Sequence, residues 1–136
     1  MNWVDLHDRL LPAKNWIVQN QLLDGSIPWD EKGKCDAWDH SECLISLAIY
    51  EEWDAFEKGV DWFFSNLNSK GLIYSEFNNQ QPTLLNYQSH HAPYIALPLL
   101  QRYLIDKNLD HLNKYLPQLN TIFSSLLDFM DSDGMY

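Results

Sequence analysis

The chain has 136 residues, of which 46% are hydrophobic and 14% aromatic, enough for one packed domain and too few for two of ordinary size. Nine Lys and Arg against nineteen Asp and Glu give a formal net charge of −10. Binding to a phosphate backbone or to an anionic membrane requires clustered cations, and the sequence has no basic run. The composition therefore argues against nucleic-acid and membrane partners.

The cysteines, the first residues and the longest apolar runs indicate the cellular compartment and whether a cofactor is needed. Cys35 and Cys43 lie eight residues apart, match no metal or redox spacing, and are expected to be reduced thiols. Residues 1–5 carry neither the cationic nor the apolar region of a secretion signal. No apolar run approaches the ~20 residues that a membrane span needs. We therefore expect a cytoplasmic protein without a cofactor.

The first part of the chain is expected to form a helix, a loop and a second helix. Apolar residues recur at helical spacing in residues 6–17, with Pro12 as the expected break. Asp-Gly and Ile-Pro pairs predict a loop over residues 20–29, and residues 32–34 a flexible tip. Residues 38–53 are apolar on nearly every side, which is typical of a helix buried all round.

The second part repeats this alternation. Residues 54–67 have one apolar stripe and predict an amphipathic helix. Residues 87–105 are apolar on most faces, and residues 109–130 are amphipathic again. A buried helix followed by an amphipathic one, twice, indicates an inner and an outer ring of helices. Strand structure is expected at residues 72–77 at most.

Three glycine turns follow the amphipathic helices. Gly25, Gly71 and Gly134 each precede an apolar or aromatic residue, and they are 46 and then 63 residues apart. This unequal spacing indicates a loose repeat of helical hairpins and not a strict solenoid.

Two stretches carry resemblances to known families. Residues 16–29 and the segment Asp36-Ala37-Trp38-Asp39-His40-Ser41-Glu42 resemble bacterial prenyltransferase-like, or phenyltransferase-domain, proteins. Residues 103–129 are similar to six-hairpin glycosidases, in which a helix ends at an acidic tip and a tyrosine- and proline-containing helix leads to an Asp-Gly loop. Both resemblances imply the same architecture, an α/α toroid of two concentric rings of helices.

The expected fold is therefore all-α, with residues 1–136 forming one helical domain. Five helices make about two and a half hairpins, so the resemblance implies an incomplete toroid, the N-terminal part of a longer one. The chain would then be a truncation, half of a split protein, or a subunit completed by another chain. An open ring exposes apolar flanks, which predicts a homo-oligomer or pairing with a chain that supplies the missing hairpins.

The densest polar cluster opens the helix predicted at residues 38–53. Asp36, Asp39 and Glu42 are the candidate catalytic residues, because in toroid enzymes the starts of inner helices face the central cavity. Paired carboxyl groups could supply a protonated acid and an ionised partner for glycoside cleavage, or could protonate an alkene and stabilise a carbocation. The spacing of Asp39 and Glu42 is equally that of a capping box, which satisfies free N–H groups at a helix start.

Aromatic and histidine side chains around the inner-helix starts are the expected substrate contacts. Aromatic faces stack on sugars and also stabilise carbocations, so they favour neither substrate class. The expected aromatic floor consists of Trp29, Trp38, Tyr74, Tyr87 and Tyr94. His40 and one of His90 and His91 are expected to face the same cavity. A metal site would need a third ligand at suitable spacing, so no metal is expected.

The leading hypothesis for function is a carbohydrate-active, six-hairpin glycosidase-like segment. A prenyltransferase- or terpenoid cyclase-like protein is the alternative enzyme class, and it would require an aspartate-rich diphosphate motif that these 136 residues lack. The third hypothesis is a non-catalytic helical scaffold or binding module. In each case a carbohydrate or isoprenoid would be the small-molecule partner.

Overall fold

The computed structural model describes residues 3–129, with side chains from residue 5 onward. The helices are α1 (Trp3–Asn20), α2 (Ala37–Ile49), α3 (Trp53–Ser65), α4 (Ala96–Asp106) and α5 (Leu109–Ser125), with 3-10 turns η1 (Pro93–Ile95) and η2 (Leu126–Phe129). The strands are β1 (Lys34–Cys35), β2 (Tyr74–Asn78) and β3 (Gln81–Tyr87). The turn expected at Gly134 and the end of the helix expected at residues 109–130 lie outside the described residues.

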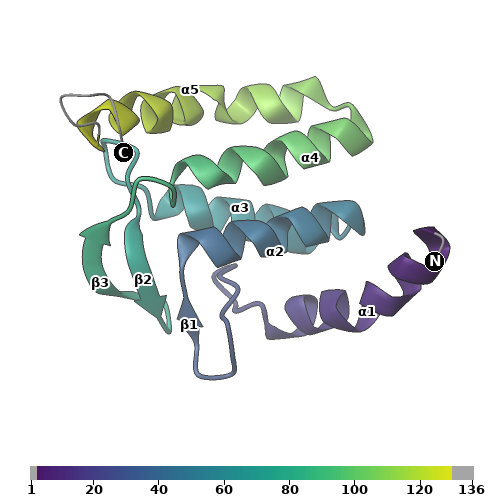
Figure 1. Ribbon diagram of the computed structural model, residues 1–136. Coiled ribbons are helices and arrows are strands. Elements are labelled where there is room, and N and C mark those ends of the chain that lie inside the picture. Colours follow the sequence, from purple (N-terminus) through teal and green to yellow (C-terminus); the bar gives the residue numbers. More distant parts are fainter. Residues whose placement is uncertain (1–2, 130–136) are drawn as a thin grey trace.

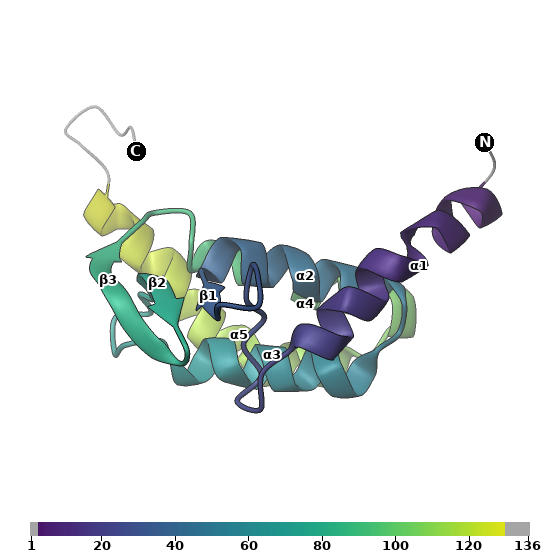
Figure 2. The same cartoon turned by 90° about the horizontal axis from the view of Figure 1, so that it is seen from below.

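The helices form two antiparallel hairpins, α2–α3 and α4–α5. Helices α2 and α4 lie side by side and both start at the end of the molecule that carries the strands (Figure 1). Helix α3 packs on α2, α5 packs on α4, and α1 leans out from the bundle (Figure 2). This is the predicted arrangement of inner helices and outer helices.

The core lies where the inner helices face their outer partners. Phe56, Val60 and Phe63 of α3 are buried against Leu44 and Leu47 of α2 in one apolar cluster. Their spacings of four and three residues are those of a helical stripe, so periodicity alone identifies them. The cluster continues along the second hairpin through Leu99, Tyr115, Leu119 and Ile122.

The prediction of a helical fold is confirmed in part: the described chain is mostly helical, but it is not strictly all-α, because it also forms a three-stranded antiparallel sheet in the order β1-β2-β3. Strand β2 overlaps the strand allowed at residues 72–77 and alternates buried and half-buried residues. Strand β3 occupies residues expected to be a loop and a helix start. The β2–β3 turn is Asn79-Gln80, both at positive φ, the backbone of a tight hairpin.

Several predicted helix ends also differ. Helix α2 ends at Ile49, not at residue 53, because Glu51 adopts a left-handed φ of 56° and turns the chain. The second inner helix starts at Ala96, not at residue 87, after the strand and the 3-10 turn opened by Pro93. Pro12 does not end α1. The carbonyl of Asp8, which lacks a donor because Pro12 has no N–H, lies on an exposed side of the helix, where water can bind it.

Helix α2 is not buried on every side within the described part of the chain. Trp38 and Ile49 stay 40% and 51% exposed, and Glu42 lies between them on the same stripe. On α4, Leu97, Leu100 and Leu104 are also exposed. None of the described helices combines the length and the apolarity needed to span a bilayer.

Candidate functional site

Asp36 forms the N-cap of α2. Its backbone is extended (φ −125°, ψ 166°), and its Oδ1 accepts the N–H of Asp39 at 2.7 Å. The cap is therefore Asp36, three residues before the Asp39–Glu42 pair that the capping-box spacing suggested. Burial raises the pKa of the Asp36 carboxyl, although the backbone N–H groups of Asp39 and Trp38 act against this.

Asp39 and Glu42 lie in one open pocket, which we call the indole pocket. It has a volume of ≈ 420 Å³ between the end of α1, the loop before β1 and the first turns of α2. Its lining consists of Trp16, Ile17, Ile27, Pro28, Trp29, Asp39, Glu42 and Cys43. Trp16 and Trp29 are 39% and 44% exposed, so both indoles are accessible to a ligand.

The pKa of the Asp39 carboxyl is shifted upward, the direction that favours a general acid. Partial burial raises its pKa, and the neighbouring charges of Asp36 and Glu42 raise it further. A carboxyl group that keeps its proton closer to neutral pH can donate it to a leaving-group oxygen. Asp39 and Glu42 are three apart on α2, so their side chains share one face of the helix.

Trp29 is held from the side of the sheet. The backbone N–H of Trp29 donates to the backbone carbonyl of Lys34 at 2.6 Å, and the Lys34 ammonium lies 4.4 Å from the centroid of the indole ring. The same ammonium pairs with Glu76 Oε2 at 2.7 Å. Cation–π and ion-pair contacts of this kind restrict the indole, which lowers the entropy that a stacking ligand must overcome.

A second group of residues joins the starts of α2 and α4. Trp38 meets His90 edge-on at 5.1 Å between ring centroids and Tyr94 at 6.0 Å. The Tyr94 hydroxyl donates to Glu42 Oε1 at 3.3 Å, so the Glu42 carboxylate links α2 to the 3-10 turn η1 that precedes α4. Of the two adjacent histidines, His90 is exposed and His91 is 3% exposed.

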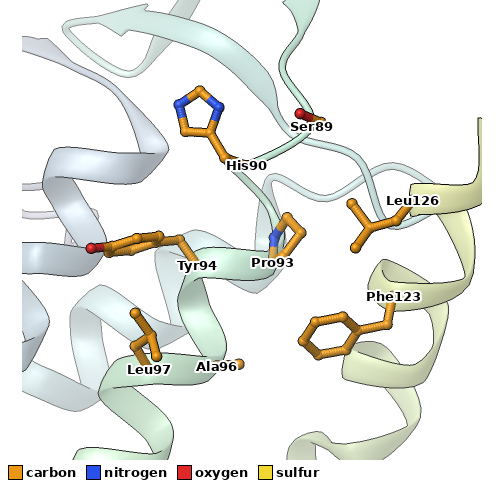
Figure 3. Close-up of a pocket in the computed structure, with 8 residues that line it drawn as sticks. All are labelled: Ser89, His90, Pro93, Tyr94, Ala96, Leu97, Phe123 and Leu126. Carbon is orange, nitrogen blue, oxygen red and sulfur yellow. The ribbon is translucent and has the colours of Figure 1, made fainter. Parts of the chain in front are cut away.

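Beside this group lies a pocket of ≈ 460 Å³ with a mainly apolar lining, which we call the α4–α5 pocket. Figure 3 shows His90, Pro93, Tyr94 and Leu97 on one side and Phe123 and Leu126 on the other. Among the residues that the structure describes, none that lines this pocket is a carboxylate.

The expectation that His40 contacts a substrate is wrong, because its ring is completely buried. Its Nδ1 accepts the N–H of Ile27 at 3.2 Å, and its Nε2 lies 2.9 Å from the carbonyl oxygen of Gly59. Burial lowers its pKa to about 4, so the ring is neutral near pH 7. The sequence had an overlooked signal, since His40, Leu44 and Leu47 step by four and three residues along the buried stripe.

Tyr87 lies on the sheet and lines neither pocket. It stacks on Tyr74 with ring centroids 5.1 Å apart and an interplanar angle of 10°, and its hydroxyl accepts from Asn68 Nδ2 at 3.2 Å. The aromatic floor is therefore divided. Trp29 belongs to the indole pocket, Trp38 and Tyr94 join the helix starts, and Tyr74 and Tyr87 cover the sheet.

Five of the eight lining residues were not among the candidates, Trp16 and Cys43 among them. Trp16 fitted the apolar spacing of α1 and Cys43 the apolar pattern of α2, so both suggested packing. Which of these side chains meet in one pocket depends on how α1, the loop before β1 and α2 pack together, which no local pattern encodes. Within residues 3–129 no cluster of three His, Cys, Asp or Glu side chains has the geometry to hold a metal ion.

Neither a protein-family model nor a curated protein matches this chain. Solved structures do share its fold. Endoglucanase Cel10, a family 8 glycosyl hydrolase from Klebsiella pneumoniae, matches with a TM-score of 0.66 and 21% identity over 86% of this chain and 38% of that one. A GH8 endo-β-1,4-glucanase from an Achatina fulica gut metagenomic library matches with a TM-score of 0.65 and 21% identity over 84% and 37%.

The endo-β-1,4-glucanase CMCax from Acetobacter xylinum matches with a TM-score of 0.61 and 14% identity over 86% of this chain and 40% of that one. These structures are (α/α)6 toroids, so the chain has the fold of part of such a toroid. It spans less than half the length of each structure. The suspected likeness to six-hairpin glycosidases is confirmed at the level of the fold.

Proposed function

We propose that this chain is a carbohydrate-handling segment of a glycosidase-like α/α toroid, and that the indole pocket is its sugar-binding surface. The observation that carries the proposal is the presence of two carboxylates and two accessible indoles in one open pocket. The flat C–H faces of a pyranose stack on aromatic rings, while its hydroxyl groups donate to carboxylates. Asp39 and Glu42 would bind hydroxyls, and Trp16 and Trp29 would stack on the ring.

The acids on α2 would have different roles. Asp39, with its raised pKa, is the candidate proton donor. Glu42, already bonded to the Tyr94 hydroxyl, is the candidate hydroxyl ligand. Asp36 would act through Asp39, since its own carboxylate caps the helix and its charge raises the pKa of Asp39.

The substrate class that fits best is a β-1,4-linked glucan. Endo-β-1,4-glucanases are among the structures that share the fold, and an open pocket suits an extended chain better than a small closed ligand. A prenyl diphosphate is less suitable, because its phosphates need cations, and within residues 3–129 the indole pocket is lined by two carboxylates and by no Lys or Arg.

Removing the Trp29 indole is expected to weaken binding of cellotetraose, a β-1,4-linked glucose oligomer. Loss of one stacking face corresponds to roughly tenfold in affinity, about 1.4 kcal/mol. Isothermal titration calorimetry on Trp29→Ala and on wild type measures this directly. Leu23→Ala is the matched control, since Leu23 is a fully exposed apolar residue of the same loop outside the pocket. Equal losses in the two variants, or no binding by wild type, would contradict the proposal.

The chain by itself is expected to show little or no hydrolysis of cello-oligosaccharides. Glycoside cleavage needs two carboxyl groups on opposite sides of the scissile bond. Asp39 and Glu42 lie on one face of one helix, so they can supply only one side. A reducing-sugar assay tests this expectation, and turnover that Asp39→Asn abolishes without loss of fold would overturn it.

Self-association is expected from the exposed face of α4. Leu97, Leu100 and Leu104 are 45%, 46% and 52% exposed, and apolar residues grouped in this way drive association. Sedimentation equilibrium should give a mass above 16.0 kDa, and Leu97→Glu with Leu104→Glu should restore the monomer. A wild-type monomer at tens of micromolar would show that this face needs no second copy.

A further inference from the structure

We infer that His40 is a positioning residue that fixes the Trp29 side of the indole pocket relative to the carboxylates of α2. The inference rests on the proposed function for what the pocket binds, and on geometry alone for what His40 holds. The buried ring joins three segments: the loop before β1 through Ile27, its own helix α2, and α3 through Gly59. It lines no pocket among the described residues, so it would act through the loop and not on a ligand.

One neutral tautomer satisfies both hydrogen bonds. The Ile27 N–H is a donor, so Nδ1 must be the unprotonated acceptor. Nε2 therefore carries the hydrogen and donates to the Gly59 carbonyl. Both backbone groups are protected from water, and losing either partner leaves a buried polar group unsatisfied.

The space for the ring depends on Gly59. A Cβ at this position would come within 2.5 Å of Leu44 Cδ2 and 3.3 Å of His40 Cε1. The ring also packs against Trp62 at 4.4 Å between centroids. The imidazole is thus fixed by close contacts on α3, and it transmits that position to the loop.

The two sides of the pocket lie on α2, which carries His40, and on the loop that is bonded to His40 through Ile27. Asp39 directly precedes His40 on α2, and Trp29 is two residues after Ile27 in the loop. The start of the loop has its own anchor, since Gln21 Nε2 donates to the carbonyls of Gly25 at 3.0 Å and Ala55 at 2.8 Å. His40 anchors the half that bears Trp29 to the helices, as Lys34 anchors Trp29 to the sheet. An apolar side chain could fill the same volume but could not accept the Ile27 N–H.

Two isosteric variants separate the two bonds. In His40→Asn the amide oxygen can take the place of Nδ1 and accept from Ile27, whereas in His40→Gln the amide nitrogen can take the place of Nε2 and donate to Gly59. Hydrogen exchange of the amides of Ser26, Ile27 and Trp29 reports the loop, and calorimetry with cellotetraose reports the pocket. We expect His40→Gln to speed exchange of the Ile27 amide and weaken cellotetraose binding, each about tenfold, and His40→Asn to keep both within about threefold of wild type.

The free energies of unfolding of both variants test whether His40 has only a structural role in the core. If the two variants are equally destabilised and show the same exchange and affinity, His40 only fills the core and the inference is wrong. Should neither variant fold, the imidazole ¹⁵N shifts of the wild-type protein decide, because an Nδ1–H tautomer contradicts the geometry and an Nε2–H tautomer supports it. If wild type binds no cellotetraose but exchange still separates the variants, the proposed function fails while the positioning of Trp29 by His40 stands.

Discussion

Gly25→Ala is expected to lower the free energy of unfolding by about 2 to 4 kcal/mol. Gly25 has a φ of +97°, and a Cβ there would overlap the carbonyl oxygen of Lys58 on α3. The left-handed conformation alone costs a non-glycine residue about 1 to 2 kcal/mol. The remainder arises because a helix backbone cannot yield, so the loop must move away from α3.

Gly33→Ala is the matched control for this experiment. Gly33 has a φ of +83°, so the conformational cost is similar, but its Cβ would meet the side chain of Asn79 on an exposed turn. A side-chain end can rotate away, so we expect a loss of only about 1 to 2 kcal/mol. Urea unfolding of both variants measures the difference. Equal losses would mean that the loop does not press against α3, and the Trp29 side of the pocket would then lack its support.

Stability is expected to fall by roughly 3 kcal/mol between pH 6.5 and pH 4 because of His40 alone. Burial lowers the pKa of this imidazole to about 4 in the folded chain, while the ordinary value is about 6.5. The unfolded chain therefore takes up the proton first as the pH falls. The contribution of His40 is complete above pH 6.5, decreases between pH 6.5 and 4, and changes no further below that range.

A comparison with His40→Asn isolates this effect from the carboxyl groups. Asp36 and Asp39 have raised pKa values in the fold, so their protonation favours the folded state as the pH falls and opposes the effect of His40. Urea unfolding at pH 7 and pH 4.5 should show a steeper loss for wild type than for the variant. Parallel pH dependences would show that the buried ring does not titrate as its environment requires.

The helices could be predicted from the sequence because apolar spacing encodes them directly. Phe56, Val60 and Phe63 mark the buried side of α3 whatever the rest of the chain does. Strand β3 could not be found in the same way. Residues 81–86 are all exposed, so no alternation of buried and exposed positions marks the strand, and only pairing with β2 defines it.

Only the part of the candidate site that lies on one helix could be predicted from the sequence. The polar residues at the start of α2 place Asp39 and Glu42 at a helix end, and the structure brings both into one pocket. Which neighbours join them depends on tertiary packing. Trp16 enters because the end of α1 lies beside the loop before β1 and the first turns of α2, and His40 has room in the core because position 59 on α3 is a glycine.

A crystal structure of this chain with cellotetraose tests most directly whether the indole pocket binds a sugar. We expect the sugar in the indole pocket, with a ring stacked on Trp29 and its hydroxyls bonded to Asp39 and Glu42. Density for the sugar in the α4–α5 pocket (Figure 3) instead, with the indole pocket empty at saturating ligand, would contradict the assignment of the carboxylates of α2 to carbohydrate binding.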